Sequence, residues 1–139
     1  SGHNSIVDKV IANHKSLGIK RAIKLPVSAP FHCSLMNKAT KIMAQELKNL
    51  NIRTSSNMMI SNVTAKEVSL ADDIKQLLVE QIENRVRWRE SVLEMINNGV
   101  NQFIEIGPGK VLSGLIKRIN KEVKIDTINN QIDIESLKI

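Results

Sequence analysis

Val100-Asn-Gln-Phe-Ile-Glu-Ile-Gly-Pro-Gly-Lys-Val-Leu-Ser-Gly-Leu-Ile-Lys-Arg-Ile119 is the stretch whose pattern determines the fold class. The apolar residues within 100–106 predict a short strand, and Gly107-Pro-Gly109 predicts a turn. The spacing of apolar residues over 111–119 predicts a helix, and 123–128 predicts another strand before a helical tail. A strand, a helix and a strand in succession indicate an α/β fold.

The chain upstream of this stretch continues the alternation of helix and strand. Its helices are expected over 4–17, 36–50, 72–82 and 88–97, and its strands over 21–27 and 58–63. Gly18 and Gly99 stand where a helix commonly ends. Pro26 and Pro30 favour an extended loop after the first strand. No repeat or low-complexity linker interrupts the pattern.

The composition is that of a single globular domain. The chain has 139 residues, of which 42% are apolar and 24% charged, but aromatic residues make up only 2%, so aliphatic side chains must build the core. No apolar run approaches the roughly 18 residues of a membrane span, so we expect a soluble, cytoplasmic protein. The single cysteine, Cys33, excludes an internal disulfide. The start without Met suggests a cut or truncated product.

The net charge of +6 is compatible with an acidic partner. Nucleic acid, a membrane surface and an acidic protein all fit this charge. A nucleic-acid reader would more often show stacking aromatic residues or a recognisable binding motif, and the sequence has neither. Nucleic acid is therefore a minor alternative.

His32 is the best candidate for chemistry, because a neutral imidazole in a loop ahead of a helix can accept a proton near neutral pH. A solvated or structural histidine is the alternative interpretation. The adjacent Cys33 is not expected to form a dyad with it, since neighbouring side chains diverge. His3 and His14, about 16 Å apart on one helix, cannot share a metal ion, and we predict no metal site.

The Gly107-Pro-Gly109 turn resembles the place where a helix start receives phosphate. It matches neither of the common glycine-rich phosphate-binding motifs, and Pro108 removes one N–H donor. A tight structural turn is the favoured interpretation.

Several separated blocks, taken together, resemble the bacterial malonyl-CoA:acyl carrier protein transacylases of fatty acid synthesis. The first runs from Lys20 to Met36 and includes Pro-Phe-His32-Cys-Ser. Others follow in the same order as in that family, and the resemblance covers essentially the whole chain as the C-terminal half of such an enzyme. These later blocks are Ser61-Asn-Val63, Gln81 to Trp88, Glu105 to Leu112, and Leu115 to Arg118.

The resemblance implies roles for particular residues. His32 matches the general base that activates a serine, and Gln81 matches the residue whose backbone carbonyl orients that imidazole. Phe31 matches a position that favours malonyl over branched acyl groups. Lys20 and Arg21 match basic positions that meet the acidic acyl carrier protein. A malonyl-CoA thioester is the implied substrate, with no further cofactor.

The departures from the family are equally informative. No Gly-x-Ser-x-Gly sequence occurs, so the nucleophilic serine would come from a missing N-terminal half, and Arg85 replaces the proline that commonly follows Asn84. The implied fold is the C-terminal portion of a hydrolase-like parallel-sheet acyltransferase domain (28–139) plus the tail of a ferredoxin-like small subdomain (1–27). The alternative function is a non-catalytic fragment that binds the carrier protein or a partner chain.

Overall fold

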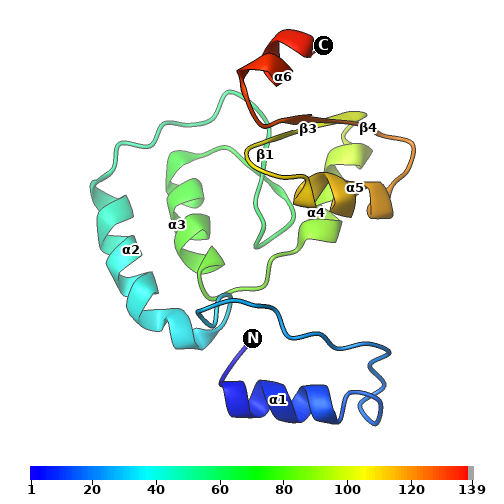
Figure 1. Cartoon of the computed structure of the whole chain (residues 1–139). Helices are drawn as coiled ribbons and strands as arrows, with labels where there is room; N and C mark the ends of the chain where they lie inside the picture. Colours follow the sequence, from blue (N-terminus) through cyan, green and yellow to red (C-terminus); the bar gives the residue numbers. More distant parts are fainter. Residues whose placement is uncertain (138–139) are drawn as a thin grey trace. The chain divides into compact units, whose positions relative to one another are not determined.

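The computed structural model describes residues 1–137 of the chain. The chain divides into two compact units, Ser1–Val86 and Arg87–Ile139. Both contain helices and short strands, as Figure 1 shows, so the fold is mixed α/β. Within the described residues, none of the helices has the length and apolar character needed to cross a bilayer.

Helices are the main regular elements of the first unit. Helix α2 packs beside α3 (Figure 1). The two-residue strands β1 and β2 pair antiparallel. Apolar residues from these elements and their connections are buried: Leu47, Ala65, Val68 and Ile74. The elements of this unit are α1 (Asn4–Ala12), the 3₁₀ helix η1 (Ser34–Met36), α2 (Asn37–Asn49), β1 (Met59–Ile60), β2 (Glu67–Val68) and α3 (Ala71–Gln81).

The second unit is a strand–helix–strand arrangement preceded and followed by a helix. Strands β3 and β4 are parallel, with Phe103 opposite Ile125. Val92 of α4, Phe103 of β3 and Ile116 of α5 form its buried core, so helices and sheet share one apolar cluster. The elements are α4 (Trp88–Asn97), β3 (Gln102–Ile106), α5 (Val111–Ile119), β4 (Lys124–Ile128) and α6 (Gln131–Ser136).

The predicted first helix is too long. We expected it to reach residue 17, but α1 ends at Ala12. The Asn13 side-chain amide donates to the Lys9 carbonyl at 2.9 Å, and His14 Nδ1 lies 2.8 Å from the Ile11 carbonyl oxygen. These side chains occupy the last helical carbonyls, and the chain then turns through Gly18, whose φ is +72°.

The strand predicted over 21–27 is also wrong. This segment is not in a sheet, and Ile23, Leu25 and Val27 are each more than half exposed. Alternating residues favour an extended backbone, but a strand also needs a hydrogen-bonded partner. Here the Val27 N–H instead donates to the Leu25 carbonyl two residues back, at 2.9 Å.

The boundary between the two compact units, after Val86, differs from the subdomain boundary after residue 27 that the family resemblance implies. The boundary after Val86 follows the packing within this chain, whereas the boundary after residue 27 refers to the subdomains of the family. The division after residue 27 stays a prediction.

Candidate functional site

His32 lies in the short loop between the extended segment and η1, and its backbone is held in an unusual conformation. Its φ is +61°, in the left-handed region that non-glycine residues rarely adopt. The His32 N–H donates to the Ile82 carbonyl, just beyond α3, at 3.1 Å. The histidine is therefore anchored to the end of a helix that is distant in sequence.

The imidazole is held by the same helix end. His32 Nδ1 lies 2.9 Å from the backbone carbonyl oxygen of Gln81, the last residue of α3. A carbonyl oxygen can only accept, so Nδ1 carries the hydrogen and Nε2 the lone pair. The Gln81 side-chain amide, 3.4 Å from Nδ1, donates instead to the Asn84 carbonyl at 3.0 Å. The resulting tautomer leaves Nε2 able to accept a proton.

Helix geometry explains why these carbonyls are available. The last carbonyls of an α-helix have no partner within the helix. At the end of α3 the N–H groups of Ile82, Glu83 and Asn84 bond back to Val79 and Glu80, not to Gln81. His32 takes the next two carbonyls, one through its ring and one through its backbone. A bond from the Asn37 amide to the Glu83 carboxylate, at 3.1 Å, joins the start of α2 to the same turn.

His32 borders an open cavity of about 920 Å³ within the first unit. Phe31 lies beside it and is about half exposed, while Val27, Leu35 and Val86 add apolar surface. The lining contains histidine, lysine and arginine but no aspartate or glutamate. We call this cavity the His32 cleft. It combines a proton acceptor with a mainly apolar wall, as ligand sites commonly do.

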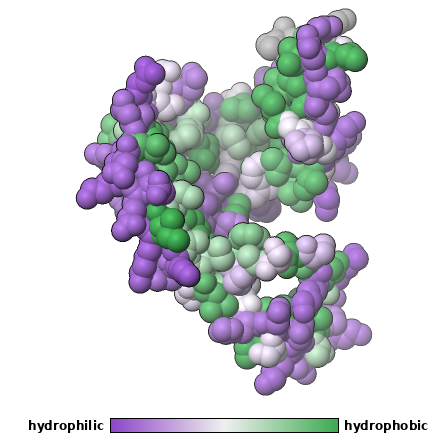
Figure 2. Space-filling view, turned by 60° about the vertical axis from the view of Figure 1, so that its left-hand side comes forward, coloured by the Kyte–Doolittle hydropathy of each residue, from purple (hydrophilic) through white to green (hydrophobic). Residues whose placement is uncertain are grey.

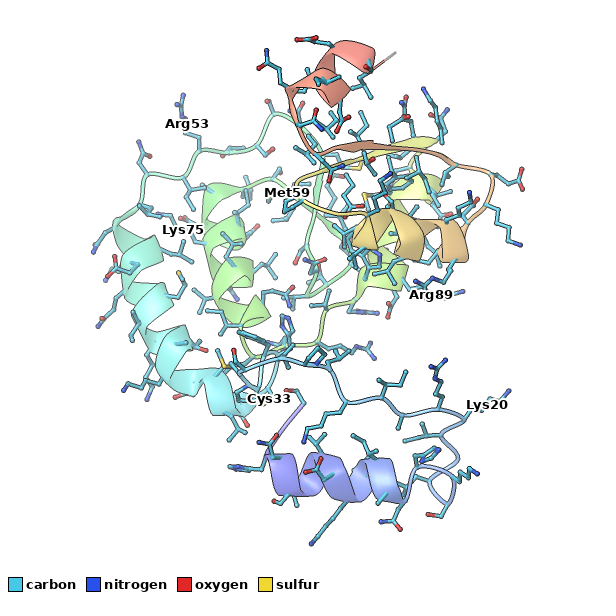
Figure 3. All side chains as sticks on the ribbon, in the orientation of Figure 1. Lys20, Cys33, Arg53, Met59, Lys75 and Arg89 are labelled. Carbon is cyan, nitrogen blue, oxygen red and sulfur yellow. The ribbon has the colours of Figure 1, made fainter. Side chains whose placement is uncertain are left out.

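The sequence-predicted site residues do not all come together. His32, Gln81 and Phe31 meet at or beside the His32 cleft. Lys20 and Arg21 lie on the exposed segment after α1 and do not line the cleft, and Figure 3 shows the Lys20 side chain extending outward. Their expected use, binding a partner protein, does not require them to be in the cleft.

Two contributions were missed from sequence. The Ile82 carbonyl, which anchors the His32 backbone, is invisible in a residue-type pattern, although the predicted end of the third helix at 82 marks where unpaired carbonyls fall. Arg85, which stands where the family commonly has proline, lines the His32 cleft. Its placement depends on how the chain turns after α3.

The other titratable candidates do not form a second site. Cys33 Sγ donates to the Pro30 carbonyl at 3.1 Å, so it bonds to its own loop and not to the His32 ring. His14 interacts with its own helix end. Among residues 1–137, no group of three or more His, Cys, Asp or Glu side chains is placed to hold a metal ion.

The Gly107-Pro-Gly109 turn is structural, because a carboxylate already occupies the helix start that could have received phosphate. Glu105 accepts the N–H groups of Leu112 and Ser113 at 3.0 and 2.8 Å. The Ser113 hydroxyl and N–H, then the N–H groups of Leu112 and Val111, lower the pKa of the Glu105 carboxyl, and partial desolvation opposes them. The hydroxyl lies near the carboxylate without good hydrogen-bond geometry, so the N–H bonds define this cap.

Comparisons with known proteins place this geometry in context. The chain is 39% identical over 135 residues to the malonyl CoA-acyl carrier protein transacylase of Staphylococcus aureus, a match that covers 97% of the chain and 44% of that relative. It superimposes on the crystal structure of an acyl-carrier-protein S-malonyltransferase from Bartonella henselae with a TM-score of 0.89 and 41% identity, over 97% of the chain and 43% of that structure.

A third relative was solved with a partner. A malonyl-transacylase in complex with its type II PKS acyl-carrier protein matches with a TM-score of 0.88 and 36% identity, over 97% of this chain and 44% of that one. No family model matches the chain.

These findings show that the chain is a homologue of acyltransferases, in agreement with its α/β fold and with the histidine that hydrogen-bonds to a backbone carbonyl. More particularly, the chain is a homologue of the malonyl CoA-acyl carrier protein transacylases. It spans less than half the length of the relatives that it matches, 44% for the Staphylococcus aureus protein.

Proposed function

We propose that this chain supplies the histidine part of a site that transfers a malonyl group from malonyl-CoA to the phosphopantetheine thiol of acyl carrier protein, in cytoplasmic fatty acid synthesis. The observation that carries the proposal is the 2.9 Å contact from His32 Nδ1 to the Gln81 carbonyl oxygen, beside the His32 cleft. This contact fixes the tautomer that a general base needs.

The chemistry would proceed in two half-reactions through a serine supplied by a segment outside this chain. His32 Nε2 accepts the serine proton as the serine oxygen attacks the malonyl thioester carbonyl. The carbon–sulfur bond then breaks, and the imidazolium returns the proton to the departing thiolate of coenzyme A. In the second half-reaction, His32 takes the proton of the phosphopantetheine thiol as its sulfur attacks the carbonyl of the malonyl-serine ester. The ester carbon–oxygen bond then breaks, and the imidazolium gives its proton to the departing serine oxygen.

The Gln81 carbonyl would orient the ring through these steps. Unlike a carboxylate, a carbonyl dipole carries no full negative charge, so it stabilises the imidazolium less. The imidazolium that forms would still return its proton to the leaving group in each half-reaction.

The remaining residues would set selectivity and partner binding. Phe31, at the cleft edge, would disfavour a branch next to the thioester carbonyl. Lys20 and Arg21 would meet the acidic carrier protein. Residues 1–27 would complete a ferredoxin-like small subdomain and 28–139 part of a hydrolase-like large one, each with segments outside this chain.

Intact-mass measurement of acyl transfer tests the proposal. The chain would be mixed with a separately produced segment that corresponds to the uncovered, serine-bearing part of a transacylase relative, and then given malonyl-CoA. We expect a malonyl adduct on the serine-bearing segment. His32→Ala should slow its formation by roughly 10²- to 10⁴-fold. His14→Ala is the matched control, because His14 bonds to its own helix end. An adduct that forms equally fast with His32→Ala would exclude this role.

A non-catalytic carrier-binding fragment is the second candidate function. It is favoured by one observation: among the hydrogen bonds of the described residues, those of the His32 ring go to Gln81 alone, with no serine as partner. A folded chain that binds holo-acyl carrier protein, but yields no adduct with any serine-bearing segment, would support this alternative.

A further inference from the structure

The His32 cleft has an unusual balance of charge. Its lining includes Lys24 and Arg85 but no carboxylate side chain. Lys24 is neutralised locally, because its Nζ lies 2.8 Å from Asp8 Oδ1. The guanidinium of Arg85 adds a second fixed positive side-chain charge to the lining, next to the apolar surface of Val86 in the cavity that His32 borders.

Arg85 is also well positioned by the backbone. It follows directly on the turn that holds His32, in which Asn84 bonds to the Glu80 carbonyl through both its N–H and its side-chain amide, at 3.0 and 2.8 Å. The Gln81 amide donates to the Asn84 carbonyl at 3.0 Å. The segment that presents Arg85 to the cleft is therefore fixed to the same helix end as the catalytic candidate.

We propose that Arg85 binds an oxyanion, a carboxylate or a phosphate, of the coenzyme A thioester that enters the His32 cleft. This inference rests on the proposed function and adds a specificity-determining residue to it. A guanidinium presents paired N–H donors that match both oxyanions, and the malonyl carboxylate and the coenzyme A phosphates are the two groups of that chemistry in the substrate.

The expected size of the effect on affinity follows from the solvent exposure of Arg85. Arg85 is exposed, so solvent and salt screen its charge. It also has an interaction elsewhere within the chain, which a ligand would share or displace. We therefore expect about a tenfold effect on affinity, at the low end for hydrogen bonds to charged groups.

Calorimetric titration of the 139-residue chain tests the inference with three probes. Malonyl-CoA offers both oxyanions, acetyl-CoA offers only phosphates, and the malonyl thioester of N-acetylcysteamine offers only the carboxylate. Each probe is titrated into the unsubstituted chain, Arg85→Gln, Arg85→Lys and Arg53→Gln. Arg53 is the matched control: it is an exposed arginine on the connection after α2, labelled in Figure 3, and does not line the cleft.

We expect Arg85→Gln to weaken malonyl-CoA binding about tenfold, Arg85→Lys to weaken it less, and Arg53→Gln to leave it unchanged. A loss seen with malonyl-CoA and acetyl-CoA alike assigns the contact to phosphate. A loss confined to the two malonyl probes assigns it to the carboxylate.

Equal affinity of Arg85→Gln and the unsubstituted chain for all probes overturns the inference, as does an equal loss in Arg53→Gln. The absence of saturable binding to the folded, unsubstituted chain overturns it too. The acyl-transfer experiment, which measures an adduct on a separate serine-bearing segment, tests the proposed function independently of this result. Circular dichroism of each variant verifies its fold.

Discussion

His32 is strained and anchored at once. Its φ of +61° disfavours most side chains, while its N–H and ring bond to two successive carbonyls at the end of α3. Histidine is more tolerant of this region than most residues, and a β-branched residue is among the least tolerant. The position therefore combines a backbone constraint with the chemistry proposed for the ring.

The strain at His32 predicts an ordering of stability that is separate from activity. His32→Val should be about 1–2 kcal/mol less stable than His32→Gly, because glycine adopts positive φ without a Cβ clash. Urea unfolding of the two variants measures the difference, and both lack the ring hydrogen bond, so that loss cancels. Equal stability would mean that the loop relaxes when the ring is removed.

Glu105 predicts a pH dependence at the residue scale. Hydrogen bonds from Ser113 and its neighbours hold the pKa of its carboxyl below the ordinary value of 4.5 in the folded chain. The stability that this gives is full above the unfolded value and is lost as pH falls through the folded one. Glu105→Gln should therefore lose less Tm than the unsubstituted chain when pH is lowered from near neutral to below 4.5.

Thermal melts across this range check the expectation for Glu105. Glu122→Gln, which makes the same change of charge at an exposed turn, is the control. It should retain the acid sensitivity of the unsubstituted chain. A Glu105→Gln melting profile that parallels the unsubstituted one would show that the cap does not contribute to acid stability.

At the scale of elements, the β3–α5 turn depends on glycine in a way that α5 does not. Gly109 has a φ of +97°, and its N–H donates to Asn129 Oδ1 at 2.7 Å. A Cβ at Gly109 would meet nothing within 4 Å, so the cost of Gly109→Ala is conformational, about 1–2 kcal/mol.

Gly114 is the matched control with the opposite expected sign. It lies inside α5, and a Cβ there would be 3.9 Å from the Arg118 guanidinium, an ordinary contact. Gly114→Ala should stabilise the chain by about 0.5–1 kcal/mol, because alanine favours the helix. Denaturant unfolding of both variants gives the two values, and a destabilising Gly114→Ala would contradict this account of α5.

The contrast among elements explains what sequence could predict. The bounds of α4 and α5 were predicted correctly, because helix periodicity and flanking glycines are local signals. The strand expected over 21–27 failed, since pairing depends on a partner that local alternation cannot supply. The short β2 was missed for a related reason: its two residues carry no period of their own.

The candidate site shows the same difference between local signals, which the sequence reveals, and long-range contacts, which it does not. The sequence alone predicted both a histidine in a loop and the end of a helix near residue 82. The contact between His32 and Gln81, 49 positions apart, was predicted from the family resemblance and not from any local pattern. The charge of the His32 cleft was not predictable, because it depends on which side chains line one cavity.

At the scale of the whole molecule, the chain exposes apolar surface and carries a net positive charge. Figure 2 shows green apolar patches among the hydrophilic surface. Large apolar side chains that are more than half exposed include Ile23, Leu25, Ile106 and Val111. Such surface is typical of contacts with further polypeptide, which agrees with a chain that spans 44% of its Staphylococcus aureus relative. The net charge of +6 is a separate property, suited to an acidic partner.

The role proposed for Lys20 and Arg21 predicts salt-dependent binding of acyl carrier protein to the segment after α1. Lys20 and Arg21 are exposed there and lie outside the His32 cleft. The double variant Lys20→Glu with Arg21→Glu should weaken binding to holo-acyl carrier protein about tenfold at low salt, mainly by slowing association, and less at high salt. Surface plasmon resonance at two salt concentrations measures both effects.

The control is the double variant Lys38→Glu with Lys41→Glu, which makes the same change in net charge at two exposed lysines of α2. Equal losses in the two double variants would mean that the carrier protein responds to total charge, because only a local contact distinguishes one pair of cations from another.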